Sequence, residues 1–249
     1  MPDYGQEKAY EELAGRFADG GAGPEGRGGD LAGVGVSEAD GLAGAEGSGA
    51  DGTDQAARAA RRSVYEKLQQ ENPDFIGWIR IPGTRIDYPV VQSKDRPDYY
   101  LHRDFYGKES SFGTPYLAED CTPGDPDRGL LLYGHHMKNG AMFAGLSGYT
   151  DQAFWEEHRE IRFDTLEESG DYEVAAVVKL SASDVDLPWQ QLVFPRTAEE
   201  RQQAWQAFEK KRFYDTGIDL KEGDQILCLV TCEYTMEDGR LMVVARRRT

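Results

Sequence analysis

Two short segments near the carboxyl end of the chain hold residue types that can do covalent chemistry. The run at 225–232 is rich in β-branched and apolar residues and ends at Cys232, and a second apolar run at 240–245 begins with Arg240. The stretch between them is polar and contains Gly239. If the two runs pair as an antiparallel hairpin, Cys232 lies beside Arg240. A guanidinium next to a thiol favours the thiolate, which is the reactive form of cysteine.

A nucleophilic cysteine also needs a base or acid that the fold brings close to it. The chain has four histidines. His135 and His136 come at the carboxyl end of a buried strand, where polar groups are unusual unless they are used. Neighbours on a strand point to opposite faces, so only one of this pair can face Cys232. We interpret His158 as structural because it ends a short helix, where a cation suits the helix dipole, and His102 precedes a polar loop.

The other two cysteines lack these features. Cys228 shares a face of its strand with Cys232, but four residues separate them by roughly 13 Å at about 3.3 Å per residue. A disulfide needs Cα atoms about 4.4–6.8 Å apart, so we interpret Cys228 as a small core residue. Cys121 lies in a loop of Pro, Gly and Asp where nothing supports reactivity.

A metal site made of His135, His136 and Cys121 is an alternative use of these side chains. Adjacent histidines on a strand diverge, however, and no Cys-x-x-Cys or His-x-x-x-His spacing accompanies them. We therefore expect neither a metal nor a cofactor.

The composition bounds the class of protein. A chain of 249 residues with 39% hydrophobic and 11% aromatic residues can form one large domain or two small ones with a proper core. The net charge of −17 argues against nucleic-acid binding, which usually needs a basic face. Three cysteines form no disulfide framework. The sequence contains neither a run of about 18 apolar residues, as a membrane span would need, nor the pattern of a signal peptide.

Residues 1–56 differ in kind from the rest of the chain. They hold more than half of the 29 glycines and more than half of the net negative charge, with few apolar residues. Such a segment buries too little apolar surface to offset the entropy of ordering it. We predict a flexible acidic spacer at 1–56, with a short helix near 6–17, and a folded domain at 57–249.

The domain pattern predicts many short strands and a few helices. Helices are expected at 57–70, 151–158 and 197–212, the last opened by a capping box from Thr197 to Glu200. Strands are expected at 75–81, 86–91, 114–117, 130–133, 159–163, 172–180, 225–232 and 240–245. Many strands with inserted helices indicate a mostly β barrel or sandwich that carries helices.

An ordered set of motifs resembles the sortases of Gram-positive bacteria, specifically class B. It comprises Tyr133-Gly134-His135, Leu229-Val230-Thr231-Cys232, Gly239-Arg240, the segments at 72–79, 87–91 and 134–137, and the long helix before the cysteine strand. The resemblance runs from about residue 57 to the end. It implies an eight-stranded sortase-type β-barrel with an N-terminal helix and a long helix before the strand that ends at Cys232.

The resemblance implies a catalytic trio of His135, Cys232 and Arg240, with His135 chosen over His136 because it directly follows the Tyr-Gly pair. The thiolate would attack a sorting signal after its threonine, and an amine of a cell-wall precursor or pilin-like subunit would then take the acyl group. Class B relatives favour Asn-Pro-x-Thr signals, and Leu-Pro-x-Thr is the other type that we consider.

By the same resemblance, the groove for that signal is lined by Tyr133, Leu101, Thr231 and Glu233. Relatives work at the outer face of the membrane, tethered by an N-terminal helix. Either this chain is a truncated soluble part, which we favour, or the acidic spacer replaces the anchor. Two other functions stay open: a catalytically idle barrel that binds surface peptides, and a mainly hydrolytic cysteine peptidase.

Overall fold

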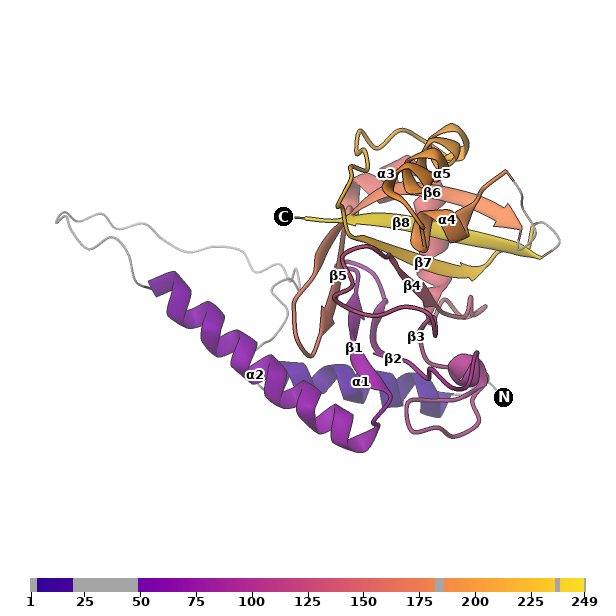
Figure 1. Ribbon diagram of the computed structural model, residues 1–249. Helices are drawn as coiled ribbons and strands as arrows, with labels where there is room; N and C mark the ends of the chain where they lie inside the picture. The colour runs from indigo at the N-terminus through magenta and orange to yellow at the C-terminus, as the bar shows by residue number, and fades with distance from the viewer. Residues whose placement is uncertain (1–3, 20–48, 182–185, 236–237, 249) are drawn as a thin grey trace, which may run out of the picture.

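The protein is built on a closed β-barrel. The computed structural model describes residues 4–19, 49–181, 186–235 and 238–248. Within these ranges, eight strands follow the order β1-β2-β3-β4-β7-β8-β6-β5 around the barrel (Figure 1). Their bounds are β1 Phe75–Arg80, β2 Asp87–Val91, β3 Tyr116–Leu117, β4 Leu130–Tyr133, β5 Glu160–Thr165, β6 Asp171–Ser181, β7 Ile226–Cys232 and β8 Gly239–Arg247. The predicted eight-stranded barrel is confirmed.

Helices lie on two sides of this barrel. They are α1 Tyr4–Asp19, α2 Gly49–Glu71, α3 Gln152–Glu157, α4 Trp189–Val193 and α5 Ala198–Lys211, with 3₁₀ helices η1 Tyr99–His102 and η2 Phe143–Thr150. Figure 1 shows α1 and α2 beneath β1 and β2, and α3, α4 and α5 beside β6 and β8. Within the described ranges, no helix has the length and apolar character that crossing a bilayer requires.

The predicted capping box opens α5. The Thr197 side chain accepts a hydrogen bond from the Glu200 backbone N–H, which satisfies one of the free donors at the helix start. Trp205 and Phe208 are fully buried on one face of this helix. The long helix before the cysteine strand is therefore confirmed, together with its apolar face.

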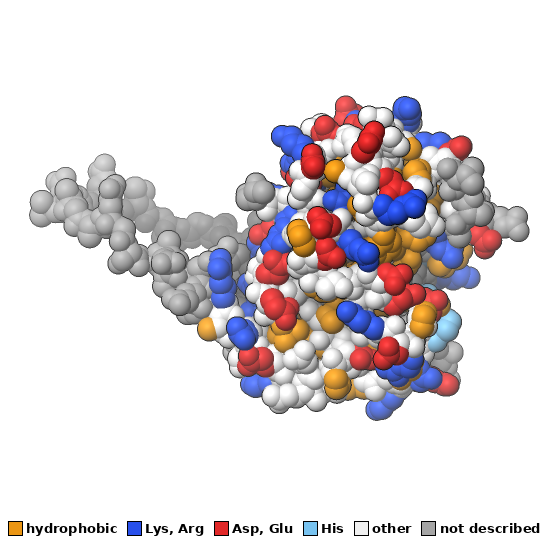
Figure 2. Space-filling model, in the orientation of Figure 1, with side chains coloured by type: hydrophobic (Ala, Val, Ile, Leu, Met, Phe, Trp, Pro, Cys, Tyr) orange, Lys and Arg blue, Asp and Glu red, His pale blue; other side chains and the backbone are white. Residues whose placement is uncertain are grey.

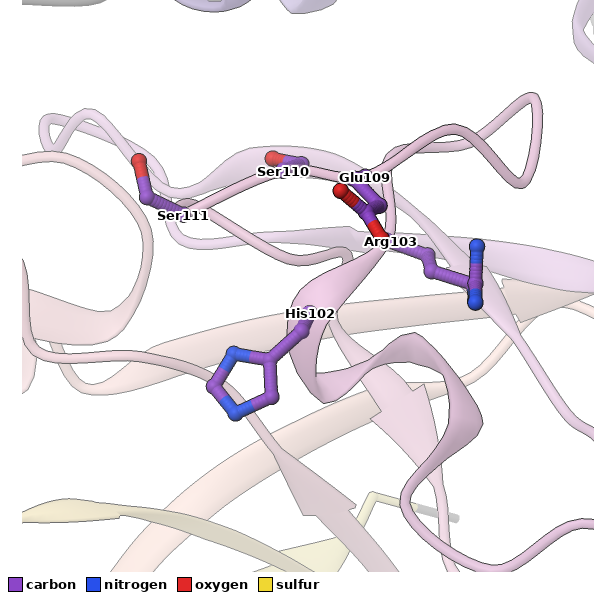
Figure 3. Close-up of a pocket in the computed structure, with 5 residues that line it drawn as sticks. All are labelled: His102, Arg103, Glu109, Ser110 and Ser111. Carbon is purple, nitrogen blue, oxygen red and sulfur yellow. The ribbon is translucent and has the colours of Figure 1, made fainter.

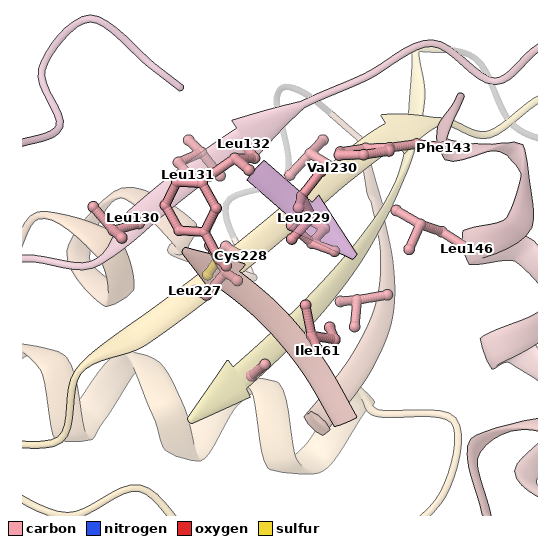
Figure 4. Packing of buried hydrophobic residues seen from close by; sticks show 14 of the residues in the cluster. Leu130, Leu131, Leu132, Phe143, Leu146, Ile161, Leu227, Cys228, Leu229 and Val230 are labelled. Carbon is pink, nitrogen blue, oxygen red and sulfur yellow. The ribbon is translucent and has the colours of Figure 1, made fainter. Parts of the chain in front are cut away.

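Strands β4 and β7 form a parallel pair in the barrel. Leu130 pairs with Leu227, and Tyr133 pairs with Val230. Both strands are apolar along almost their whole length and are covered on both faces, which is typical of buried parallel strands. Figure 4 shows their leucines among the buried hydrophobic residues of the cluster. Because the strands are parallel, their carboxyl ends lie at the same edge of the sheet.

The hairpin expected near the carboxyl end is present. Strands β7 and β8 pair antiparallel, and Cys232 is the cross-strand partner of Arg240. Strand β6 pairs with the other edge of β8, where Leu180 faces Arg240. Arg240 is therefore held from both sides by neighbouring strands.

Two helices depart from the sequence-based expectations. Helix α2 begins at Gly49, ahead of the predicted start at 57. The five residues of α4 were not predicted, because so short a segment shows no helical periodicity.

Helix α1 belongs to the segment that we expected to be a spacer. Its Tyr10 and Leu13 are buried, and Tyr10 packs edge-on against Tyr88 of β2 with ring centroids 5.8 Å apart. The Tyr10 hydroxyl donates to the Gly113 carbonyl at 2.8 Å and lies 2.9 Å from Thr114 Oγ1. The spacer expectation did not include this contribution to the core, and the predicted 1–56 boundary includes residues 20–48, which lie outside the described residues.

We predict that Tyr10→Phe lowers the free energy of unfolding by about 1–2 kcal/mol, because the change removes only the buried hydroxyl and leaves its carbonyl acceptor unpaired. Urea denaturation of the full chain measures this. The control is Lys8→Ala on the exposed side of α1, where the ion pair with Glu12 at 3.8 Å should contribute less than about 0.5 kcal/mol. Equal stability of Tyr10→Phe and the parent protein would contradict the docking of α1.

Candidate active site

The site lies where β4 and β7 end. After β4 the chain continues beside the end of β7, because the Gly134 N–H donates to the Val230 carbonyl at 3.1 Å. The Thr231 hydroxyl returns a hydrogen bond to the Gly134 carbonyl at 2.8 Å. A Cβ on Gly134 would lie 2.6 Å from the Phe143 ring, so this close approach needs glycine. The result is that His135, which follows β4, and Cys232, which ends β7, lie at one edge of the barrel.

The imidazole of His135 is held by a backbone carbonyl. Its Nε2 lies 2.6 Å from the Leu101 carbonyl oxygen in η1. A carbonyl can only accept, so Nε2 donates its proton to this hydrogen bond, and Nδ1 is not engaged by the Leu101 carbonyl. Burial lowers the pKa of His135, and the neighbouring His102 lowers it further, whereas the bond to Leu101 opposes both effects.

Close packing against the Leu101 carbonyl also requires a glycine, Gly113. Gly113 has φ +61°, a backbone conformation that side chains rarely adopt, and a Cβ there would lie 2.5 Å from the Leu101 oxygen. Since Tyr10 donates to the Gly113 carbonyl, helix α1 supports the loop that holds His135. The chain of contacts runs from the N-terminal helix to the site.

Cys232 differs from the other two cysteines in exposure. Cys121 and Cys228 are fully buried, whereas Cys232 is partly exposed at the end of β7. Burial raises the pKa of Cys121 to about 12 and also raises that of Cys228, which keeps both as thiols. The prediction that Cys228 is a core residue is confirmed, and Cys232 is the thiol that solvent can reach.

The guanidinium of Arg240 lies on the strand beside Cys232 and donates from Nη1 to the Gly239 carbonyl at 2.9 Å. Burial raises the pKa of Tyr133 to about 12, and the charge of Arg240 opposes this rise.

The four residues expected to line the groove have different surroundings. Leu101 and Tyr133 are partly exposed, and the Tyr133 ring stacks on Tyr116 at 5.4 Å between centroids. Thr231 is buried, and its hydroxyl is bonded to Gly134. Glu233 forms an ion pair with Lys179 at 3.1 Å. Leu101, Tyr133 and Thr231 thus adjoin the trio, whereas the Glu233 carboxylate is directed to β6.

The sequence did not single out His102 as part of this site. Its ring lies 5.6 Å from that of His135 between centroids, tilted by 32°. His102 also lines a surface cavity of about 380 Å³ together with Arg103, Glu109, Ser110 and Ser111 (Figure 3). Its position directly after Leu101 was the available signal, but the fold was needed to bring it to His135.

The alternative of a metal centre finds no support here. Within the described ranges, no three His, Cys, Asp or Glu side chains gather so that they could hold a metal ion. The buried Cys121 is hydrogen-bonded to the Gly129 carbonyl at 3.6 Å.

A partly exposed cysteine, a carbonyl-held histidine and an arginine meet at one edge of a closed barrel. The family model described as "Sortase domain" matches residues 79–248. Sortase B of Listeria monocytogenes is 31% identical over 184 residues, which is 73% of each chain. Sortase B of Staphylococcus aureus is 30% identical over 191 residues, or 74% of this chain and 75% of that protein.

A solved structure agrees with these relatives. Sortase B of Clostridium perfringens is 31% identical, has a TM-score of 0.67, and covers 74% of this chain and 99% of that chain. The chain belongs to the sortase family of cysteine transpeptidases, and within that family to class B. The resemblance read from the motifs is confirmed.

We predict that the His135 ring titrates, in NMR spectra, below the ordinary histidine value of about 6.5, because burial lowers its pKa. His102→Gln should raise this pKa by removing a like charge, whereas His158→Gln should leave it unchanged. The folded protein binds this proton less tightly than the unfolded chain does. Stability from His135 is therefore present above about pH 6.5 and is lost as the pH falls through the folded-state pKa. A value at or above 6.5 would contradict the burial of His135.

Proposed function

We propose that this chain is a sortase that cleaves a C-terminal sorting signal after threonine and transfers the protein to an amine. The observation that carries the proposal is the parallel pairing of β4 and β7, because it brings His135 and Cys232 to one edge with Arg240 across from the thiol. A cysteine, a proton carrier and a cation at one edge are the groups that acyl transfer through a thioester needs.

In the first half-reaction, the Cys232 thiolate attacks the carbonyl carbon after the threonine. The tetrahedral intermediate collapses when the C–N bond breaks, and the leaving amine takes a proton from Nδ1 of the His135 imidazolium. In the second half-reaction, neutral His135 removes a proton from the incoming amine, which attacks the thioester and releases the Cys232 thiolate. The enzyme returns to its starting protonation state.

Arg240 stabilises the oxyanion that forms in both half-reactions. One well-placed donor contributes about 3–4 kcal/mol to such a transition state in other enzymes. The strands on both sides of Arg240 fix its backbone at the position across from Cys232, which keeps the side chain within reach of the thiol.

The substrate groove is assigned to Tyr133, Leu101, Thr231 and Glu233. Leu101 and Tyr133 offer partly exposed surface beside His135, and Thr231 acts through its bond to Gly134. The preferred signal is of the Asn-Pro-x-Thr type, with Leu-Pro-x-Thr as the second candidate. The acceptor is an amine of a cell-wall precursor or of a pilin-like subunit, and the site of action is the outer face of the cell membrane.

The test uses peptides with each signal, mixed with the chain in the presence and absence of triglycine, and products are separated and identified by mass. We expect an amine-linked product after the threonine. Cys232→Ala should abolish both cleavage and transfer. Arg240→Lys should lose at least about 100-fold in rate, because an ammonium cannot reproduce the planar guanidinium.

The matched control is Arg246→Lys on the same strand, where the side chain approaches Glu173 at 3.9 Å. It should keep the parent rate. Cleavage without transfer would identify a hydrolytic peptidase, and full turnover by Cys232→Ala would contradict the nucleophile assignment.

A further inference from the structure

The second histidine of the pair is bonded to the backbone of the nucleophile. His136 Nδ1 lies 3.1 Å from the carbonyl oxygen of Cys232. Since a carbonyl can only accept, Nδ1 carries a proton and donates it. His136 is partly exposed and follows β4 directly after His135. In this short segment, His135 is the histidine assigned to proton transfer, and His136 binds the backbone of Cys232 at the end of β7.

Tyr234, two residues after Cys232, also contacts His136. Its hydroxyl donates to the His136 backbone carbonyl at 3.1 Å, and its ring lies edge-on to the His136 imidazole with centroids 5.4 Å apart. The Tyr234 side chain is 70% exposed, so a core-packing role does not explain its position.

Four hydrogen bonds therefore join residues 134–136 to residues 230–234. In order along the chain, they are the Gly134 N–H to Val230, the Thr231 hydroxyl to Gly134, the His136 ring to Cys232, and the Tyr234 hydroxyl to His136. The first two lie before His135 and Cys232, and the last two lie at or beyond them. Without the bonds made by the His136 ring and the Tyr234 hydroxyl, residues 134–136 would be joined to the β7 strand only at positions before Cys232.

We propose that His136 is a positioning residue, which fixes the backbone of Cys232 through Nδ1 so that the thiol keeps its place relative to His135 and Arg240. Tyr234 supports it by fixing the His136 backbone. This inference rests on the proposed function in taking Cys232 as the nucleophile. Small displacements of a reacting group cost large factors in rate, so the contact should affect reaction more than binding.

The chemistry of the contact defines the variants. In His136→Asn the amide nitrogen can occupy the position of Nδ1 and donate to the Cys232 carbonyl. In His136→Gln the amide nitrogen extends instead to the region of Nε2 and leaves the carbonyl without this donor. Tyr234→Phe removes the hydroxyl and keeps the ring contact. His158→Gln is the control, because His158 Nδ1 lies 3.0 Å from the Pro82 carbonyl in the same kind of contact.

Two rates are measured at one pH for each variant of the full chain: alkylation of Cys232 by iodoacetamide, followed by peptide mapping, and acylation by an Asn-Pro-x-Thr peptide. We expect His136→Asn to stay within about twofold of the parent and His136→Gln to lose about tenfold in both rates, with KM unchanged. Tyr234→Phe should lose about twofold, since its hydrogen bond is exposed. His158→Gln should react like the parent protein.

Equal rates for the Asn and Gln variants, or unchanged or faster alkylation in His136→Gln, would overturn the proposal. Circular dichroism separates these outcomes from loss of folding, because the Asn and Gln variants remove the same imidazole. Alkylation needs no sorting signal. A parent protein that is alkylated but never acylated would therefore contradict the proposed function, while the Asn and Gln comparison would still decide the role of His136.

Discussion

The parallel pairing of β4 with β7 is the constraint on which the rest of the structure depends. Each strand is an almost continuous apolar run, so burial on both faces is the only arrangement that removes the leucines from water. Placed side by side and parallel, the two strands must end at the same edge. His135, just after β4, and Cys232, at the end of β7, lie at this edge although almost one hundred residues of chain separate them. The hydrophobic core thus brings two residues that are distant in the sequence to one edge of the barrel.

Contacts from other elements orient the residues at this edge. The ring of His135 is oriented by the Leu101 carbonyl, which comes from the loop segment around η1, outside β4 and β7. That loop depends on Gly113 for its close backbone approach and on Tyr10 of α1 for a buried hydrogen bond. On the other side, β6 and β7 hold the backbone of Arg240 between them. The Leu101 segment and β6, which carry none of these three residues, thus support His135 and Arg240.

The sequence was informative where contacts are local and uninformative where they are not. The hairpin that pairs Cys232 with Arg240 follows from two apolar runs and a polar loop, and it could be predicted without any relative. The partner of His135 could not be predicted in this way, because nothing in an alternating or apolar pattern indicates which distant carbonyl will face a ring. The contribution of α1 to the core was not predicted for a similar reason. The sequence around it is rich in glycine, and the burial of Tyr10 depends on a distant contact with β2.

The central claim is that Cys232 alone, among three cysteines, forms the acyl-enzyme. It is tested most directly by trapping the chain with a sorting-signal peptide in the absence of an amine acceptor, digesting it, and locating the added mass by tandem mass spectrometry. The account predicts one acyl group per chain, on the peptide that contains Cys232, and none on Cys121, which is fully buried. An adduct on Cys121 or Cys228, or an adduct that survives in Cys232→Ala, would contradict it.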